Sequence, residues 1–396
     1  MQSWRGFLIC AAAVAVCACD DDDTSEPADA AVEPMVVATY NGGLARGFVP
    51  YAEERTGPLS EKLGTVDVDV LCVQEFWEAA DRERLEAAVR GNLPHAYSIA
   101  PVPGDCGGEV ACPAEEADPL AMCAREMCGD EPDDNLVTCT ITNCGEQVNA
   151  LSDACTSCIG GQVGNSLDDI LAVCGPAAEH RPCYAYGGSV GTAILSRYDM
   201  AATDSIAFDS ALNRRAALYA HLTGTPRGDV HVFCTHLTSK LTNIPYPGGR
   251  CADDPSMTCS AGSFEAEQLN EINELRDWID EKAGQGQVVV MGDFNTGPAV
   301  DGATAEIPEN YNALVEGFDR TYAAQDDATC TFCGGANPLI VGDDVEHQVL
   351  LDHVLLRGFT GITTHGVRFL TEPVTLDGID TPQAYSDHFG VQVTIE

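Results

Sequence analysis

Segment 287–295, with the sequence QVVVMGDFN, constrains the fold of this chain more than any other. Its four apolar residues after Gln, three of them β-branched, follow one another without alternation, which predicts a central strand buried on both faces. Gly292 allows a tight turn at the end of the strand, where Asp293 and Asn295 follow. Asp and Asn are ordinary turn residues, but their oxygen atoms are also the ligands that a hard cation such as Mg²⁺ prefers.

The same design, an apolar run that ends in polar side chains, recurs along the chain. Largely apolar runs cover 35–38, 70–73, 230–234 and 349–351, and an alternating strand-like segment at 391–395 follows an Asp-His pair. The polar side chains at these strand ends are Asn41, Glu75, His236, Asp293 with Asn295, Asp352, and Asp387 with His388. They make up the inventory of a metal-assisted phosphoester site: carboxylates for a cation and for orienting a base, an imidazole base, and amides for phosphate oxygens.

Seven short motifs follow one another between residues 39 and 388. They are Thr39-Tyr40-Asn41, Leu71-Cys72-Val73-Gln74-Glu75, Gly191-Thr192-Ala193-Ile194-Leu195-Ser196-Arg197, Thr235-His236-Leu237, Gly292-Asp293-Phe294-Asn295, Leu351-Asp352-His353 and Ser386-Asp387-His388. Each is common alone, but all seven in this order resemble the endonuclease/exonuclease/phosphatase superfamily, which includes deoxyribonucleases, abasic-site endonucleases, inositol polyphosphate 5-phosphatases and neutral sphingomyelinases. The resemblance implies one α/β domain over 34–396, a four-layer α/β/β/α sandwich of two mixed, largely antiparallel sheets.

The resemblance also implies a role for each matched residue. Glu75 would supply the metal carboxylate, and Asn41 beside it would hold the metal or the phosphate. His388 would be the general base that takes a proton from the attacking water, since an imidazole with an unperturbed pKa of about 6.5 can accept a proton near neutral pH. Asp352 would hold His388 in the right tautomer.

The remaining matched residues would complete this site. Asp293 and Asn295 would position water and phosphate, and His236 would stabilise developing charge or protonate the leaving group. Asp387 would bind a second metal or lie in the outer shell. For Arg197, a substrate-binding role and an exposed arginine at a strand end are both open. The expected cofactor is Mg²⁺ or another divalent cation, which would neutralise the transition state.

The N-terminus resembles an export signal. An apolar run at 7–16, too short to span a bilayer, follows Arg5. A small residue before Cys19 resembles a bacterial lipoprotein cleavage site, so we expect a signal peptide at 1–18 and a lipid on Cys19 that anchors the protein to a membrane. A secretory signal without lipid is the alternative. Segment 19–33, which has four consecutive Asp and no aromatic residue, is expected to form a disordered acidic tether.

The net charge is extreme. The chain has 62 acidic and 20 basic residues, which gives −42 at pH 7. Because nucleic-acid binding depends on neutralising phosphates with Lys and Arg, this composition favours a lipid headgroup or a small phosphodiester over nucleic acid as substrate. Acidic proteomes of saline habitats offer a second explanation, which says nothing about substrate.

The cysteines indicate an oxidising compartment. Of 19, three lie in the leader, and Cys72 and Cys234 lie inside apolar strands, where we expect buried thiols. The remaining 14 are an even number, as expected for disulfides. For Cys330 and Cys333 we expect a short structural disulfide; a redox or zinc site is the alternative.

Ten cysteines fall between Cys106 and Cys183, in a segment that departs from the family pattern. A unit this small lacks a sufficient core of its own, so we predict a disulfide-rich helical insertion over 104–183. In the family, the loop at this place borders the substrate cleft. The insertion therefore either forms a wall that selects substrate or is a surface element that adds stability.

Within the superfamily, the sequence is similar to secreted sphingomyelinases in the motif Tyr385-Ser386-Asp387-His388-Phe389 and in having His236 followed by a loop and a helix. We therefore expect a secreted or lipid-anchored, monomeric, metal-dependent phosphodiesterase outside the cytoplasm, with a sphingomyelinase-like enzyme as the favoured branch. An extracellular deoxyribonuclease-like endonuclease is one alternative. A catalytically inactive surface binding module is the other, although such a scaffold would be expected to have lost at least one matched residue.

Overall fold

The computed structural model describes residues 33–102, 110–131, 133–162, 164–179, 182–242 and 244–396. Residues from Glu33 to Glu396 group into one unit. The predicted signal peptide at 1–18, Cys19 and almost all of the predicted tether at 19–33 lie outside the described residues. Among the described helices, none is long and apolar enough to cross a membrane.

In the described part of the chain, five consecutive helices separate the first three strands from a run of six strands. The strands are β1 (Met35–Asn41), β2 (Val70–Gln74), β3 (His95–Tyr97), β4 (Ala193–Ser196), β5 (Asp199–Ala207), β6 (Ala216–Thr225), β7 (Gly228–His236), β8 (Gly249–Arg250), β9 (Thr258–Cys259), β10 (Gln287–Asp293), β11 (Arg320–Thr321), β12 (Phe332–Cys333), β13 (Gln348–Val349), β14 (Asp352–Arg357), β15 (Thr364–Phe369) and β16 (Gly390–Ile395). The helices are α1 (Ala52–Leu63), α2 (Ala79–Val89), α3 (Ala114–Cys128), α4 (Asp133–Asn143), α5 (Gly145–Asn149), α6 (Asp153–Gly160), α7 (Leu167–Cys174), α8 (Phe264–Ala283) and α9 (Pro308–Val315), with short 3-10 helices η1 (Ala185–Gly188), η2 (Tyr322–Ala324) and η3 (Gly342–Glu346).

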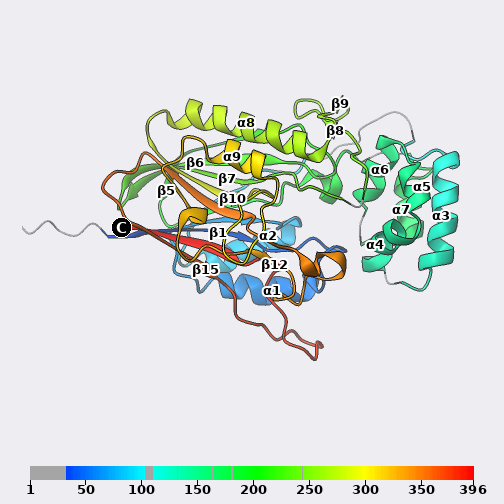
Figure 1. The fold of residues 1–396 in the computed structure, drawn as a ribbon, viewed down its shortest axis with the longest axis horizontal. Helices are drawn as coiled ribbons and strands as arrows, with labels where there is room; N and C mark the ends of the chain where they lie inside the picture. The colour runs from blue at the N-terminus through cyan, green and yellow to red at the C-terminus, as the bar shows by residue number, and fades with distance from the viewer. Residues whose placement is uncertain (1–32, 103–109, 132, 163, 180–181, 243) are drawn as a thin grey trace, which may run out of the picture. The chain divides into compact units, whose positions relative to one another are not determined.

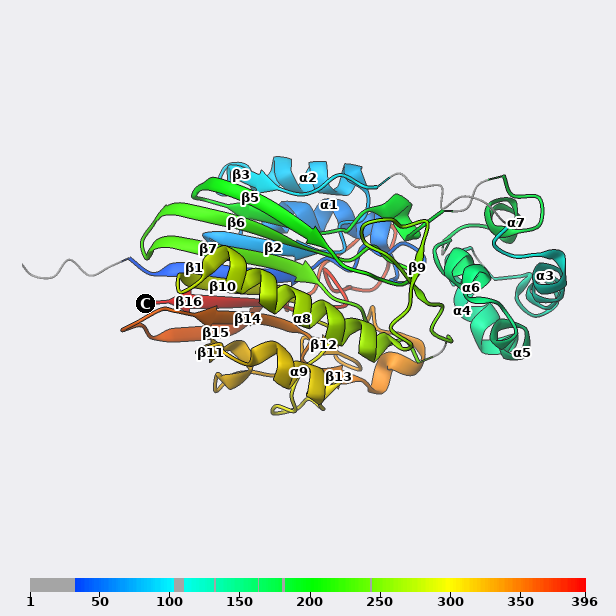
Figure 2. The same ribbon diagram turned by 90° about the horizontal axis from the view of Figure 1, so that it is seen from above.

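Two six-stranded sheets lie face to face (Figure 1 and Figure 2). Their strand orders are β15-β16-β1-β2-β4-β3 and β11-β14-β10-β7-β6-β5. Neighbouring strands are antiparallel except β1 with β2 and β7 with β10. Helices α1 and α2 pack on the outer face of the first sheet, and α8 and α9 pack on the outer face of the second. The predicted four-layer sandwich of mixed, largely antiparallel sheets is confirmed.

Strand β10 lies at the centre of this arrangement, as its sequence predicts. Val289 and Met291 point between the two sheets, whereas Val288 and Val290 point toward α8. All four are fully buried. Because successive side chains of a strand face opposite ways, an unbroken apolar run satisfies both faces at once.

Helix α8 covers the outer face of the second sheet. Ser263 caps its N-terminus by accepting a hydrogen bond from the backbone N–H of Ala266, and the first turn is acidic, as the helix dipole favours. Ile272, Leu275 and Ile279 face the sheet. This burial explains why a strongly charged sequence forms one long helix here.

Cys72 and Cys234 form a disulfide, so the prediction that they are buried thiols was wrong. Cys72 lies on β2 and Cys234 on β7, and the bond joins the two sheets within the central core. The sequence places each cysteine on its own strand but does not reveal which strand faces it across the sandwich. The bond closes a sequence separation of 162 residues, which stabilises the fold by about 5 kcal/mol in the chain-entropy description.

The predicted disulfide-rich helical insertion is confirmed as helices α3 to α7, between β3 and β4. Its disulfides are Cys112–Cys155, Cys123–Cys144, Cys128–Cys139 and Cys158–Cys174. These bonds lie within small apolar clusters and hold short helices that share little core. Elsewhere, Cys251–Cys259 and the predicted structural disulfide Cys330–Cys333 are also formed.

Candidate active site

Three strands of the second sheet bring three predicted residues side by side. In the parallel register of β10 and β7, Asp293 lies opposite His236, and in the antiparallel register of β10 and β14 it lies opposite Asp352. Strand β14 runs the opposite way, so its first residue meets the last residues of the other two strands. All three side chains are buried.

The first sheet supplies the other residues from the facing edge. Strands β1 and β2 are parallel and in register at their ends, which puts Glu75 next to Asn41. His388 lies just before β16, which pairs with β1 in the antiparallel sense. The Asn41 Nδ2 atom donates to Asp293 Oδ2 at 2.9 Å and thus joins the two sheets across the site.

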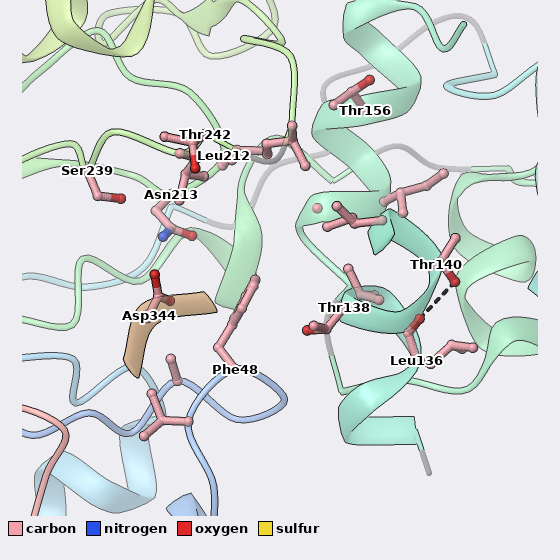
Figure 3. A pocket seen from close by; sticks show the side chains of 18 of the residues that line it. Phe48, Leu136, Thr138, Thr140, Thr156, Leu212, Asn213, Ser239, Thr242 and Asp344 are labelled. Carbon is pink, nitrogen blue, oxygen red and sulfur yellow. Dashed lines mark hydrogen bonds between the residues drawn. The ribbon is translucent and has the colours of Figure 1, made fainter. Parts of the chain in front are cut away.

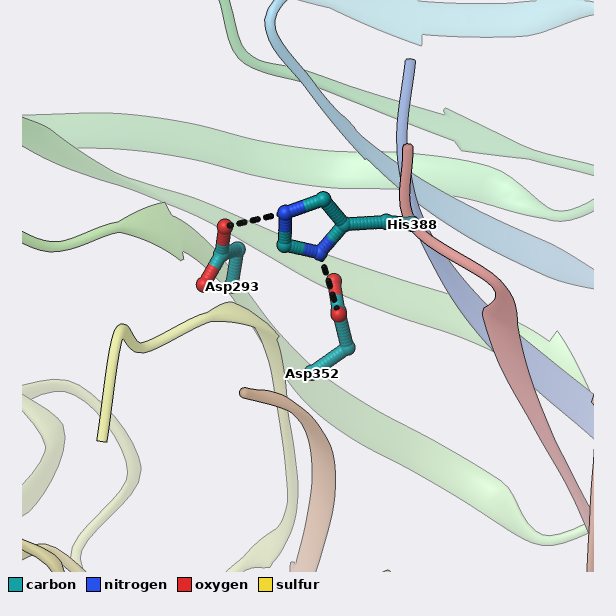
Figure 4. A group of neighbouring side chains, drawn as sticks. All are labelled: Asp293, Asp352 and His388. Carbon is teal, nitrogen blue, oxygen red and sulfur yellow. Dashed lines mark hydrogen bonds and ion pairs between the residues drawn. The ribbon is translucent and has the colours of Figure 1, made fainter. Parts of the chain in front are cut away.

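His388 is held between two carboxylates (Figure 4). Its Nδ1 atom lies 2.8 Å from Asp352 Oδ2, and its Nε2 atom lies 3.8 Å from Asp293 Oδ2. Burial by itself would lower the pKa of His388, but Asp352 and Asp293 together outweigh burial and raise the pKa well above its usual value. The geometry is that of an imidazole whose tautomer is fixed by one carboxylate.

A short disulfide-closed turn supports this pair. Thr331 lies between Cys330 and Cys333, and its Oγ1 atom accepts hydrogen bonds from the backbone N–H groups of Leu351 and Asp352, at 3.0 and 3.2 Å. The next residue, Phe332, packs its ring edge-on against the His388 imidazole, with ring centroids 5.3 Å apart. The turn therefore contacts both members of the His388–Asp352 pair.

Asp293 accepts hydrogen bonds at both carboxylate oxygens. Asn41 Nδ2 donates to Oδ2, and the backbone N–H of Asn295 donates to Oδ1 at 2.9 Å. Burial and the neighbouring Asp352 raise the pKa of Asp293 to about 7. Asn295 has a left-handed backbone, with φ of 50°, and its Nδ2 atom donates to the Leu237 carbonyl, which fixes the turn after β10.

Glu75 and the His388 cluster could each hold a divalent cation. Ligand atoms of Asp293, Asp352 and His388 lie within 4.8 Å of one another. However, Asp293 is already satisfied by hydrogen bonds, and His388 and Asp352 bond each other directly. Glu75 Oε2 and Asp352 Oδ1 are both buried and have no hydrogen-bond partner among the residues that the structure describes. Asp352 is already paired with His388, whereas Glu75 lines the cleft. Burial, followed by the nearby Asp387, raises the pKa of Glu75. A cation beside Glu75 would relieve this cost, so Glu75 fits the metal better.

His236 faces the same carboxylate from the other side, with Nε2 3.5 Å from Asp293 Oδ2. Burial, then the positive charges of Arg215 and His388, lowers the pKa of His236 well below its usual value. Its Nδ1 atom has no hydrogen-bond partner in the described part of the chain. The two histidines of the site therefore differ: neutral imidazole is favoured at His236 and imidazolium at His388.

The sequence matches a model of the Endonuclease/Exonuclease/phosphatase family over residues 41–388. The chain belongs to this family. No curated protein matches the sequence significantly.

Solved structures of this family share the fold. Sphingomyelinase C from Streptomyces griseocarneus is 15% identical with a TM-score of 0.52, and the alignment covers 91% of this chain and 99% of that one. Beta toxin from Staphylococcus aureus with bound magnesium ions is 12% identical with a TM-score of 0.54, over 91% and 99% of the two chains. TDP2 from D. rerio, complexed with a single-strand DNA product, is 13% identical with a TM-score of 0.51, over 92% and 99%. At these identities the likeness concerns the fold.

The structure places Asp387 in the cleft and Arg197 away from it. Asp387 lines the cleft beside Glu75, and it lies so close to Gly43, whose φ is 56°, that a Cβ atom there would collide with it. Arg197 follows β4 at the opposite end of the sheet and forms ion pairs with Asp67 and Asp69, at 2.8 and 2.9 Å. Of the two interpretations of Arg197, the geometry therefore favours the structural one.

Arg215 is a site residue that the family motifs did not single out. It lies just before β6, lines the cleft together with Glu75 and His236, and is 5% exposed. Its Nε and Nη1 atoms have no hydrogen-bond partner on any described residue. Burial lowers the pKa of Arg215. Nearby acidic groups raise it, and Glu271 has the largest effect among them, but burial outweighs them. A buried guanidinium with two unsatisfied N–H groups is costly unless a ligand anion completes it. No sequence pattern marks this arginine as a site residue.

The site residues open into one cleft of about 660 Å³. Trp77 and Tyr186 stack beside Glu75 with ring centroids 4.8 Å apart, and Trp77 also contacts the ring of His236. The same cleft continues to the helices of the insertion (Figure 3). Its volume lies in the range of about 300–1,000 Å³ that is usual for small-molecule sites.

Proposed function

We propose that the protein is a magnesium-dependent phosphodiesterase that hydrolyses lipid or other small phosphodiesters, with sphingomyelinase-like activity as the favoured branch. One observation carries the proposal: a His388–Asp352 pair opens onto a cleft that also holds the buried Glu75 carboxylate and the buried Arg215 guanidinium. A base, a cation site and an anion-binding group within one cleft are the requirements for attack of water on a phosphodiester.

In this mechanism Asp352 keeps the proton of His388 on Nδ1, so that Nε2 can take a proton from water. Asp293 and Asn295 would orient that water, and Arg215 would bind the phosphate oxygens. Neutral His236 would donate a hydrogen bond to the phosphoryl group. A divalent cation held by Glu75 would neutralise charge that develops on the phosphate and, by repelling the imidazolium, favour the base form of His388.

The cysteines indicate the cellular compartment of the protein, and Cys19 suggests how it is held there. The disulfides of the described residues indicate an oxidising compartment outside the cytoplasm. We propose in addition that Cys19 carries a lipid and that the enzyme works as a monomer at the cell envelope. Cys19→Ser should move the protein from the membrane fraction to the soluble fraction; if wild type is soluble as well, there is no anchor.

The test of the activity is hydrolysis of sphingomyelin, phosphatidylcholine and plasmid DNA, each with Mg²⁺ and with EDTA. We expect metal-dependent cleavage of a lipid, lost in His388→Ala and kept in His365→Ala, which changes an exposed histidine on β15. Cleavage of DNA alone would instead support the nuclease alternative. If none of the substrates is turned over, the inactive binding module becomes the better explanation.

A further inference from the structure

The cleft has two chemically different halves. One half contains the charged residues of the proposed active site, such as Glu75, Asp293 and His388. The other half, here called the apolar annex, is lined by Leu136, Val137, Ile141 and Ile159 of the insertion and by Phe48 and Leu212 of the sandwich. Both halves belong to the same cavity.

The insertion turns an uncharged face toward this cavity. Among its described residues between 110 and 179, none that lines the cavity is Asp, Glu, Lys or Arg, although the whole chain carries a charge of −42. Helix α4 directs Thr138 toward the sandwich, on the side of Phe48, whereas Leu136 and Thr140, one turn apart, face the interior of the insertion (Figure 3). The uncharged lining includes Leu136, Val137, Ile141 and Ile159 of the insertion's own core, so the annex extends between its helices.

Two of the three α4 threonines that line the cavity use their hydroxyl protons within the helix. Thr140 Oγ1 donates to the Leu136 carbonyl at 2.8 Å, and Thr142 Oγ1 donates to the Thr138 carbonyl at 2.9 Å. Because these hydroxyl protons are used within the helix, they are not available to a polar ligand. The insertion side of the annex has no aromatic ring or charged group with which to bind a nucleobase or a sugar.

We propose that the apolar annex binds an aliphatic chain of the substrate while its phosphodiester group lies at His388. The inference rests on the proposed function and names the part of the substrate that the insertion recognises. The annex is continuous with the site, and Phe48 is 54% exposed, so an apolar occupant would remove apolar surface from water. The insertion would thus select lipid phosphodiesters over water-soluble ones.

The first test needs no variant. The rate of hydrolysis is measured with Mg²⁺ for 4-nitrophenyl phosphocholine, which has no acyl chain, and for phosphocholine lipids whose chain is lengthened by one methylene at a time below micelle formation. The expected result is a KM that falls roughly fourfold per added methylene, with little change in kcat, until the annex is filled.

The second test uses surface and wall variants. Phe48→Ala and Ile141→Ser should raise KM for the longer-chain lipids at least tenfold and leave 4-nitrophenyl phosphocholine unchanged. Met127→Ser is the matched control, because Met127 is as exposed as Phe48 but lies outside the cavity. Because Phe48 is on the surface, its variant is expected to fold even if Ile141→Ser does not.

The two hypotheses fail in different ways. If the phosphodiesters are cleaved with the same KM at every chain length, the annex does not bind the chain, while the proposed phosphodiesterase stands. If no member of the series is cleaved, the proposed function fails, and the inference fails with it.

Discussion

Asp352 and His388 are 36 residues apart in the sequence, yet Asp352 Oδ2 lies 2.8 Å from His388 Nδ1. Asp352 begins β14 in one sheet, and His388 lies two residues before β16 of the other. The pair therefore exists only when the two sheets are stacked in the observed way. Four predictions follow from this and the neighbouring contacts.

Asp352→Asn should lower kcat by about 10²–10⁴-fold, because the amide does not hold the imidazole in the required tautomer. The lost carboxylate also stops raising the His388 pKa, so the base form persists to lower pH. The acidic limb of the kcat/KM profile should therefore move to lower pH while the maximum falls. An unmoved limb would show that Asp352 does not set this titration. Asp326→Asn, at an exposed position, is the control.

Glu75→Gln should abolish stabilisation of the fold by Mg²⁺. Ligand binding to the native state raises the free energy of unfolding by about 2.7 kcal/mol at a hundred times Kd, so the Tm of wild type should rise with Mg²⁺ concentration. The variant should show no such rise, whereas the exposed Glu78→Gln should behave as wild type. An equal rise in all three proteins would place the cation elsewhere, for example at the Asp293 cluster.

Arg215→Met tests whether the guanidinium acts on the substrate. Its loss removes the proposed phosphate contact and should reduce kcat/KM by about 10²–10³-fold. Because Arg215 offsets the buried carboxylates of Glu267 and Glu271, its removal should also lower the free energy of unfolding. Urea denaturation and steady-state kinetics check both effects. Arg214→Met is the matched control, since Arg214 bonds the Ala100 carbonyl and does not line the cleft. If the variant is less stable but has normal kcat/KM, Arg215 stabilises the fold and does not bind the phosphate.

Removal of the inter-sheet disulfide, as Cys72→Ala with Cys234→Ala, should cost about 5 kcal/mol from loop entropy alone. The Cys251–Cys259 disulfide closes a separation of 8 residues, and its removal as Cys251→Ala with Cys259→Ala should cost about 2.5 kcal/mol. Urea denaturation of both double variants under oxidising conditions measures the difference. Equal losses would mean that the unfolded chain keeps the two sheets together without the bond.

The sequence predicts the fold and most of the site because both follow from strand ends. An unbroken apolar run places Asp293 at the edge of a sheet, and the same pattern places Asn41, His236 and Asp352. Once the ends of neighbouring strands meet, the polar residues after them must lie close together. The order of the motifs then indicates which strands these are.

The remaining features depend on pairings between distant segments. The bond between Cys72 and Cys234 requires knowledge of which β2 and β7 residues face each other. Arg197 matches a motif, but its position at the far end of β4 is set by Asp67 and Asp69. Arg215 is recognisable by two guanidinium nitrogens that have no hydrogen-bond partner among the described residues, which no sequence pattern reports.

The register of β10 limits which changes in chain length this protein can tolerate. A slip of one residue against β7 and β14 would move Val289 and Met291 from the inter-sheet core to the α8 side and turn Asp293 away from His236. The same hydrogen-bond ladder thus sets both core packing and catalytic geometry. Neither evolution nor protein engineering can therefore insert or delete residues in β10 without losing the site. Changes in length are confined to segments outside the ladder, such as the helical insertion.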